Sequence, residues 1–260
     1  MGPSDEFFEY LRFHVCLSSA SIALFGYLSF NTFSTTALLL FISAFSIVGS
    51  VYSYNFITDC AEDEKNHQPS ANRFVRNRRL GAAVSVFLAL AGLSLSLLLP
   101  SIHLIYACLM LMVGHGYSFL RLKRAFMLKN AITGLGFGLM YLYGTGFLYL
   151  PGLMAVLLVV IAMSIIADLR DYYGDKLVRI PTLPVVLGIG NSKLAIGLLL
   201  LAAAAIIIGL GLGSFFSLLL FIPAALLVLN FHENSYVSHL YMRSGLITLV
   251  LVQLLLSLPF

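Results

Sequence analysis

Tyr54-Asn55-Phe56-Ile57-Thr58-Asp59-Cys60-Ala61-Glu62-Asp63 is the stretch that decides the fold, because it carries polar groups at the end of a long apolar segment, residues 36–58. A membrane-spanning helix needs about 20 mostly apolar residues. Asn55, Asp59 and Asp63 recur every four residues, which places them on one helix face, about 6 Å apart per step. These three residues, the first motif, therefore predict a spanning helix with a row of oxygen-bearing side chains at its end.

A second acidic stretch, Asp168-Leu169-Arg170-Asp171-Tyr172-Tyr173-Gly174-Asp175, follows another apolar segment. Asp171 and Asp175 are again four residues apart, and Asp168 extends the same predicted helix face. We call Asp168, Asp171 and Asp175 the second motif. Carboxylates that share one face at a membrane boundary repel each other and lose hydration. Both costs fall when a divalent cation lies between them.

Two such rows predict a site for Mg²⁺ and a diphosphate. Mg²⁺ prefers hard oxygen ligands and commonly shares one or two carboxylates with substrate phosphates. The alternative is that both rows are solvated helix ends with ordinary surface charge. A single row fits either interpretation, whereas two rows at matching depth favour the metal site.

The composition of the chain indicates that its solvent is mostly lipid. Of 260 residues, 60% are hydrophobic and 10% are charged, whereas a soluble domain has about 25% charged residues. We therefore predict an all-α integral membrane protein that forms a single domain over residues 1–260. Nine apolar segments are long enough to be spanning helices: 11–31, 36–58, 80–99, 101–120, 130–150, 152–170, 193–212, 214–231 and 243–259.

The charged residues predict the orientation of the chain in a cell membrane. With nine spans, every Lys and Arg falls on one side, which the positive-inside rule makes cytoplasmic together with the N-terminus. The acidic residues lie on this side too, so the helix centres carry almost no ionisable groups. This disfavours an ion-coupled transporter, which usually places such groups near the midplane. The net charge of +4 follows from this loop bias and does not indicate nucleic-acid binding.

The spacing Asn-x-x-x-Asp-x-x-x-Asp, followed later by Asp-x-x-x-Asp, resembles the signature of the UbiA superfamily of intramembrane prenyltransferases. Two further segments resemble the same family: Tyr117–Arg124 together with Asn130, and Arg179–Gly188. The chain departs from the pattern in two places. Asn55 is followed by Phe56 where family members often carry Asn-Asp, and the common Arg-Pro after the first motif is replaced by a separated Pro69 and Arg73.

The resemblance implies nine helices around a central cavity and transfer of a prenyl group from an isoprenyl diphosphate, such as geranylgeranyl diphosphate, to a lipophilic acceptor. It implies Mg²⁺ as the cofactor, held by Asp59, Asp63, Asp171 and Asp175, with Asn55 as a further ligand. The substrate-binding residues that it implies are Asn55, Tyr117, Arg121, Lys123, Arg12, Asp168 and Arg73.

Several of these residues also have structural interpretations. Arg121 and Lys123 could hold phosphate oxygens or act only as a topogenic positive cluster. Arg12 could approach the substrate or extend to the interface, and Tyr117 could face the site or belong to the interfacial aromatic belt. His115, between two glycines, is interpreted as a helix-contact residue.

Two acceptor classes remain open from sequence, an aromatic quinone precursor and geranylgeranylglyceryl phosphate. Leu169-Arg170-Asp171 resembles menaquinone-type members, whereas Thr182-Leu183-Pro184 resembles the ether-lipid type.

A terpene cyclase on the same fold and a membrane transporter are the alternative functions. The motif of CDP-alcohol phosphotransferases is absent, and a scaffold without chemistry would not need two rows of carboxylates.

Overall fold

The computed structural model is all-helical and describes residues 7–8, 10–63, 77–122, 125–126 and 128–209, with only the backbone described for 60–63. Five of its helices, α3, α5, α6, α8 and α10, are long and apolar enough to cross a membrane. The segments predicted over 214–231 and 243–259 lie outside the described residues. The helices are α2 (Phe13–Leu28), α3 (Thr35–Asp63), α5 (Arg78–Ser96), α6 (Ser101–Phe119), α7 (Leu128–Thr145), α8 (Leu150–Arg170), α9 (Tyr172–Val178) and α10 (Leu183–Gly209).

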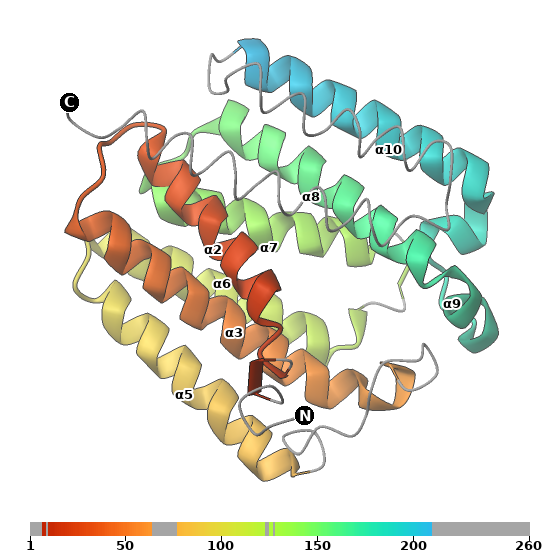
Figure 1. Cartoon of the computed structure of the whole chain (residues 1–260), viewed down its shortest axis with the longest axis horizontal. Helices are drawn as coiled ribbons and strands as arrows, with labels where there is room; N and C mark the ends of the chain where they lie inside the picture. Colours follow the sequence, from red (N-terminus) through yellow and green to blue (C-terminus); the bar gives the residue numbers. More distant parts are fainter. Residues whose placement is uncertain (1–6, 9, 64–76, 123–124, 127, 210–260) are drawn as a thin grey trace.

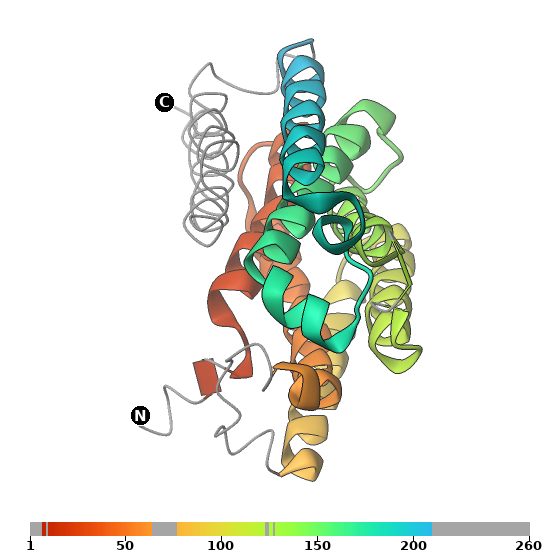
Figure 2. The ribbon, with the colours of Figure 1, turned by 90° about the vertical axis from the view of Figure 1, so that its right-hand side faces the viewer.

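Helix α3 lies at the centre of the first part of the molecule, where it packs against α2, α5 and α6 (Figure 1). Helix α7 packs against α2, α6 and α8, and α8 packs against α10 (Figures 1 and 2). One apolar core is built mainly from α2, α3, α6 and α7, and another from α8 and α10. Large apolar side chains point outward instead, including Phe87 on α5, 70% exposed, and Met112 on α6, 69% exposed. Such faces are stable against lipid and not against water.

Polar groups between the spanning helices bond to each other. The Ser43 hydroxyl on α3 donates to the Gly92 carbonyl oxygen of α5 at 2.8 Å, and the Tyr143 hydroxyl on α7 donates to the Ser43 oxygen at 2.7 Å. Ser96 lies between them, 3.0 Å from Ser43 and 2.9 Å from Tyr143. Small hydroxyl-bearing residues suit such contacts because helices in lipid associate by close packing and interhelical hydrogen bonds.

The structure corrects the prediction that a helix begins at residue 193, because α10 begins ten residues earlier at Leu183. Pro184 fits this start, since the first helical turn needs no proline N–H. Gly188 then interrupts the helix with φ of 82°, a conformation that glycine adopts without steric cost. Lys193 therefore lies within the helix, beyond this kink, and not at its beginning as predicted.

The second motif also departs from the predicted continuous helix. Helix α8 ends at Arg170 and α9 begins at Tyr172, so Asp171 is the junction residue between them. The Asp175 N–H still donates to the Asp171 carbonyl oxygen at 2.9 Å. Asp168 thus belongs to a different helix from Asp175, and the face that we expected the three carboxylates to share is broken at Asp171.

Helices α2 and α7 approach so closely that Gly144 has no room for a side chain. A Cβ at Gly144 would overlap the Ala23 carbonyl group of α2, whereas a Cβ at Gly136 on the same helix would meet nothing within 4 Å. We expect Gly144→Ala to lower the thermal unfolding midpoint in detergent, at a cost of about 1–3 kcal/mol for overpacking. Gly136→Ala, as the control, should unfold like the unmodified protein; equal midpoints for both variants would contradict this packing.

Candidate functional site

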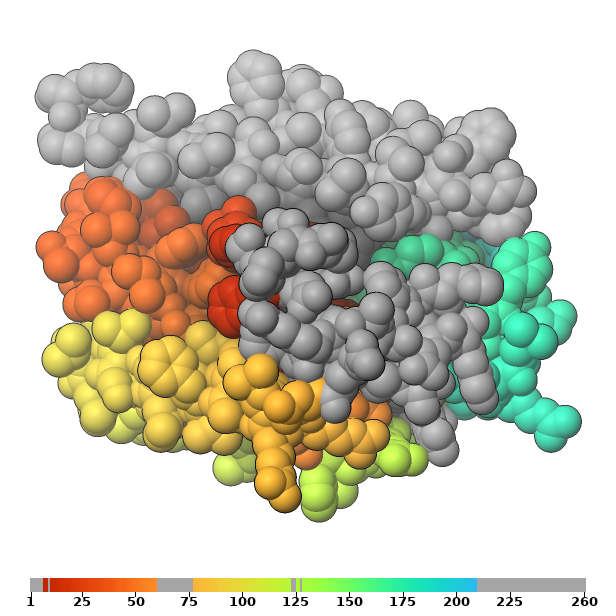
Figure 3. All heavy atoms as spheres, turned by 60° about the horizontal axis from the view of Figure 1, so that its bottom comes forward, coloured from red at the N-terminus to blue at the C-terminus, as the bar shows by residue number. Residues whose placement is uncertain are grey.

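The residues of both acidic motifs lie at one end of the helical bundle. The end of α3 meets the end of α6 there, through a hydrogen bond from the Ser118 hydroxyl to Asn55 Oδ1 of 3.0 Å. The beginning of α7 meets the end of α8 there too, through an ion pair between Lys129 and Asp168. In Figure 3, which brings this side of the molecule forward, the first turn of α5 (amber) and the α9 region (teal) are visible.

The first motif contributes Asn55 and Asp59, both half-buried on α3. The bond from Ser118 fixes the carboxamide of Asn55, because one lone pair of Oδ1 accepts the hydroxyl proton. Within the described part of the chain, the second lone pair of Oδ1 and the amide N–H groups have no assigned partner. Asp63 ends the same helix, but its side chain lies outside the described residues, as do Lys123 and Arg73.

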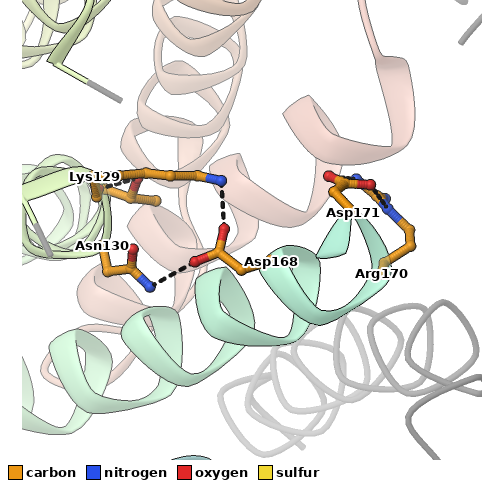
Figure 4. Close-up of polar contacts among 6 residues, drawn as sticks. Lys129, Asn130, Asp168, Arg170 and Asp171 are labelled. Carbon is orange, nitrogen blue, oxygen red and sulfur yellow. Dashed lines mark hydrogen bonds and ion pairs between the residues drawn. The ribbon is translucent and has the colours of Figure 1, made fainter. Parts of the chain in front are cut away.

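The carboxylate of Asp168 is completely buried and held from two sides by α7. The ammonium of Lys129 donates to Oδ1, and the Asn130 amide donates to Oδ2 at 3.2 Å (Figure 4). Asp168 has no exposed surface, and the Lys129 side chain is 25% exposed. A buried carboxylate is tolerated only when it is paired and hydrogen-bonded in this way.

Asp171 has a different environment, at the surface of the α8–α9 junction. Its oxygens accept from Nε and Nη2 of the adjacent Arg170 at 2.8 and 2.9 Å. Figure 4 places this pair apart from Asp168 and Lys129. Both members are partly exposed, and exposed ion pairs contribute only about 0–1 kcal/mol, so Asp171 can separate from Arg170 at small cost.

Asp175 is buried, with 4% of its surface exposed, although it lies on the short helix α9. Its Oδ2 has no hydrogen-bond partner among the described residues, and neither does the buried hydroxyl of Thr182. Burial raises the pKa of Asp175 from 3.8 to about 6, against the lowering effect of Lys129. A buried carboxylate oxygen without a partner costs about 1–3 kcal/mol, and more for a charged group.

Tyr117, near the end of α6, lies between the two motifs. Its phenol is within electrostatic range of Asp59 from the first motif and Asp168 from the second, and also of Lys129. Asp59 and Asp168 are 109 residues apart in the chain, and both lie within electrostatic range of this side chain. The role of Tyr117 in substrate binding stays a prediction.

Two of the predicted phosphate-binding arginines adopt left-handed backbone conformations. Arg12 (φ 48°) precedes α2, and Arg121 (φ 51°) follows the end of α6. The guanidinium carbon of Arg12 lies 5.3 Å from the ring centroid of Phe56, one residue after Asn55. Arg12 therefore packs on the helix that carries the first motif, while Arg121 is exposed.

The donor set fits a hard divalent cation that is completed by a substrate. Among the residues that the structure describes, no three His, Cys, Asp or Glu side chains gather closely enough to hold a metal ion by themselves. The unsatisfied oxygen of Asp175 and the carboxylate of Asp59 nevertheless offer the ligand type that Mg²⁺ selects. Mg²⁺ usually takes only one or two protein carboxylates and keeps waters or phosphate oxygens for its other positions.

Sequence reasoning did not single out Lys129, Ser118 or Thr182 as site residues. Lys129 was counted only among the basic residues that set the orientation, although it directly precedes Asn130 of the family-like segment. Its position in the first turn of α7 was a usable signal, because a cation there faces the positive end of the helix dipole. Such an unfavourable placement indicates a specific anionic partner.

The fold and the site define an integral membrane protein with an acidic, oxygen-rich centre at one end of its helices. The sequence model of the UbiA prenyltransferase family matches residues 14–243. The chain belongs to the UbiA prenyltransferase family. No curated protein matches the chain.

Solved structures share the fold over nearly the whole chain. A UbiA homologue from Aeropyrum pernix K1 has a TM-score of 0.75 and 20% identity, over 92% of this chain and 98% of that chain. A digeranylgeranylglyceryl phosphate synthase has a TM-score of 0.68 and 20% identity, over 99% of both chains. A UbiA homologue from Archaeoglobus fulgidus, bound to DMAPP and Mg²⁺, has a TM-score of 0.69 and 13% identity, over 95% of this chain and 99% of that chain.

Because the pKa of Asp175 is raised in the folded protein, its ionisation destabilises the fold as the pH rises from about 4 to about 6. We expect Asp175→Asn, measured without divalent cations, to raise the thermal unfolding midpoint at pH 7.5. The gain should shrink when the pH is lowered through 6, where Asp175 itself becomes neutral. Asp171→Asn removes an exposed ion pair and should change the midpoint little at either pH; a gain for Asp175→Asn that is independent of pH would contradict this explanation.

Proposed function

We propose that this protein transfers a prenyl group from an isoprenyl diphosphate to a lipophilic acceptor, with Mg²⁺, at the cytoplasmic face of the membrane. The observation that carries the proposal is the position of both acidic motifs at one end of the bundle, where Ser118 bonds to Asn55 of the first motif and Lys129 pairs with Asp168 of the second. Membership of the UbiA prenyltransferase family supports the reaction class. The solved structure of a homologue with DMAPP and Mg²⁺ supports the choice of donor and cofactor.

The residues that would hold Mg²⁺ are Asp59, Asp63, Asp171, Asp175 and Asn55. Bound there, Mg²⁺ would neutralise the negative charge that grows on the diphosphate as the allylic carbon–oxygen bond breaks. Asp175 presents its unsatisfied oxygen already buried. Asp171 has to leave its pair with Arg170, which partial exposure makes inexpensive.

The remaining chemistry concerns the phosphate oxygens and the carbocation-like carbon. Arg121 and Lys123 are proposed to bind phosphate oxygens, Arg121 by paired hydrogen bonds. Arg12, which precedes α2, and Arg73, from the segment between α3 and α5, are proposed to add positive charge. Phe56, Tyr52 and Tyr117 bring aromatic rings to the same end of the bundle, where their faces can stabilise developing positive charge.

The wider architecture is proposed to follow the sequence prediction. One domain over residues 1–260 would contain nine spanning helices around a central cavity, with the N-terminus and the acidic end in the cytoplasm. The supporting observation is the distribution of Lys and Arg, which the positive-inside rule assigns to the cytoplasmic side. The prenyl chain would lie among apolar side chains, in contact with the bilayer.

The acceptor is proposed to be geranylgeranylglyceryl phosphate or an aromatic quinone precursor. The Thr182-Leu183-Pro184 run and the likeness to a digeranylgeranylglyceryl phosphate synthase support the former. The Leu169-Arg170-Asp171 run supports the latter. A cyclase would use the same ionisation without an acceptor, so its product would form from the diphosphate alone.

The experiment uses the full-length protein in detergent with geranylgeranyl diphosphate and Mg²⁺. We expect Mg²⁺-dependent binding and turnover, and a loss of at least about 100-fold in turnover for Asp59→Ala and for Asp175→Ala, since each removes charge stabilisation of the leaving group. Asn31→Ala is the control, because Asn31 lies on the α2–α3 connection and, among the described residues, its side chain bonds the Tyr27 carbonyl oxygen of α2. Turnover is measured with a naphthoate acceptor, with geranylgeranylglyceryl phosphate and with neither.

Consumption of one acceptor would identify the substrate class, and product without an acceptor would identify a cyclase. Diphosphate binding that needs neither Mg²⁺ nor the two aspartates would contradict the proposed site.

A further inference from the structure

Beyond the two aspartate motifs, the structure places a buried cation in the site. We propose that Lys129 is a diphosphate-binding residue, and that Asp168 is not a metal ligand but the positioning residue that holds the Lys129 ammonium in place. The inference rests on the proposed function, because it needs a diphosphate as the substrate. It assigns different roles to two residues that the sequence alone predicts to be one of the orientation-setting basic residues and a substrate-binding aspartate.

The direction of the Lys129 side chain argues against a topogenic role. A lysine that only orients a helix extends its ammonium to water at the interface. Lys129 instead reaches from the first turn of α7 into the bundle, to a carboxylate with no exposed surface (Figure 4). In this position the ammonium loses part of its hydration, and the cation lies at the positive end of a helix dipole. Both effects are unfavourable. The protein thus positions this charge specifically.

The bonds of Asp168 argue against a role as a metal ligand. Lys129 donates to Oδ1 and Asn130 donates to Oδ2, so two successive residues of α7 hold the carboxylate from both sides, with one lone pair of each oxygen used. Asp168 is fully buried, whereas Mg²⁺ retains several waters around it and requires ligands that it can reach with them. Asp168 therefore serves as the counter-ion of Lys129, and Asp175 supplies the oxygen that is still unsatisfied.

The ammonium of Lys129 has more N–H donors than its bond to Asp168 uses. A lysine has three N–H donors, and among the described residues one of them is assigned, to Asp168. Tyr117 and Asp175, both candidate site residues, also lie within electrostatic range of its charge. The side chain is 25% exposed, so a ligand can reach it. A compact ammonium among hydroxyl and carboxylate groups is suited to a phosphate oxygen.

A purely structural ion pair between α7 and α8 is the competing explanation, and a double variant separates the two. Removing one partner leaves a buried unpaired charge, which costs about 3–5 kcal/mol, whereas replacing both by neutral groups is often neutral or stabilising. Lys129→Met and Asp168→Asn preserve size, and the asparagine keeps an oxygen for Asn130. The double variant should therefore fold even where the single variants do not.

The test compares the wild type, Lys129→Met, Asp168→Asn and the double variant in detergent. Three quantities are measured: the thermal unfolding midpoint, the Kd for geranylgeranyl diphosphate at saturating Mg²⁺, and the Mg²⁺ concentration that gives half-maximal diphosphate binding. Lys176→Met is the control for net charge, because it removes one positive charge from α9, where its ammonium lies over the Tyr172 ring. Asp59→Ala is the control for a lost metal ligand.

We expect the single variants to lose thermal stability and the double variant to regain it. The double variant should still bind diphosphate about 10- to 100-fold more weakly, which is the effect of one lost charge-assisted hydrogen bond. Its Mg²⁺ midpoint should stay near that of the wild type, in contrast to Asp59→Ala. Lys176→Met should bind like the wild type.

Each of the other possible outcomes contradicts one part of the proposal. A double variant with wild-type diphosphate affinity would make the ion pair structural and overturn the role of Lys129. A Mg²⁺ midpoint displaced as far as in Asp59→Ala would make Asp168 a metal ligand. If the wild type binds no diphosphate with Mg²⁺, both this inference and the proposed function are wrong, whereas Asp59-dependent binding with no effect of the Lys129 variants overturns this inference alone.

Discussion

The neutralisation of one buried carboxylate governs the arrangement of the acidic end of this protein. Asp168 lies on α8 without contact with water, so its charge has to be compensated within the bundle. Lys129 and Asn130 provide this compensation from the first turn of α7. A separate hydrogen bond, from Ser118 to Asn55, joins the end of α6 to the end of α3. This end of the bundle thus contains an ion pair that spacing within either motif does not reveal.

In the apolar middle of the bundle, the spanning helices are also held together by polar and close backbone contacts. Lipid competes equally well for apolar side chains, so helices there associate through close backbone approach and hydrogen bonds rather than through apolar burial. Gly144 lets α7 approach the Ala23 carbonyl of α2, and Ser43 joins α3 to α5 and α7. Large apolar residues such as Phe87 and Met112 remain on the outer faces. Rigid packing in the middle of the bundle fixes the directions in which the helix ends present their polar groups.

The sequence predicted the bounds of the described helices well where an apolar segment had clear ends. It predicted them poorly where polar residues lie at or near the end of an apolar segment. Residues 36–58 and 101–120 correspond to α3 and α6 within a few residues, apart from the polar extension of α3 to Asp63. The predicted beginning at residue 193 was wrong, because Thr182 and Pro184 resemble loop residues but begin a kinked helix. The expected shared face of the second motif was wrong at Asp171, where the chain turns from α8 into α9. Periodicity cannot show such a break, since a junction residue keeps the same spacing in the sequence.

By itself, the sequence determined that this is an all-α membrane protein of the UbiA type with two acidic motifs, because hydropathy and the four-residue spacing are local properties. Only the tertiary structure decided the burial and the bonding partners of each carboxylate. Asp175 is buried with one oxygen that has no partner among the described residues, Asp171 is paired at the surface, and Asp168 is paired with a lysine 39 residues away. The physical reason is that burial and pairing depend on which helices lie side by side. Identical residue types at regular spacing therefore acquire different partners and accessibility only when the bundle forms.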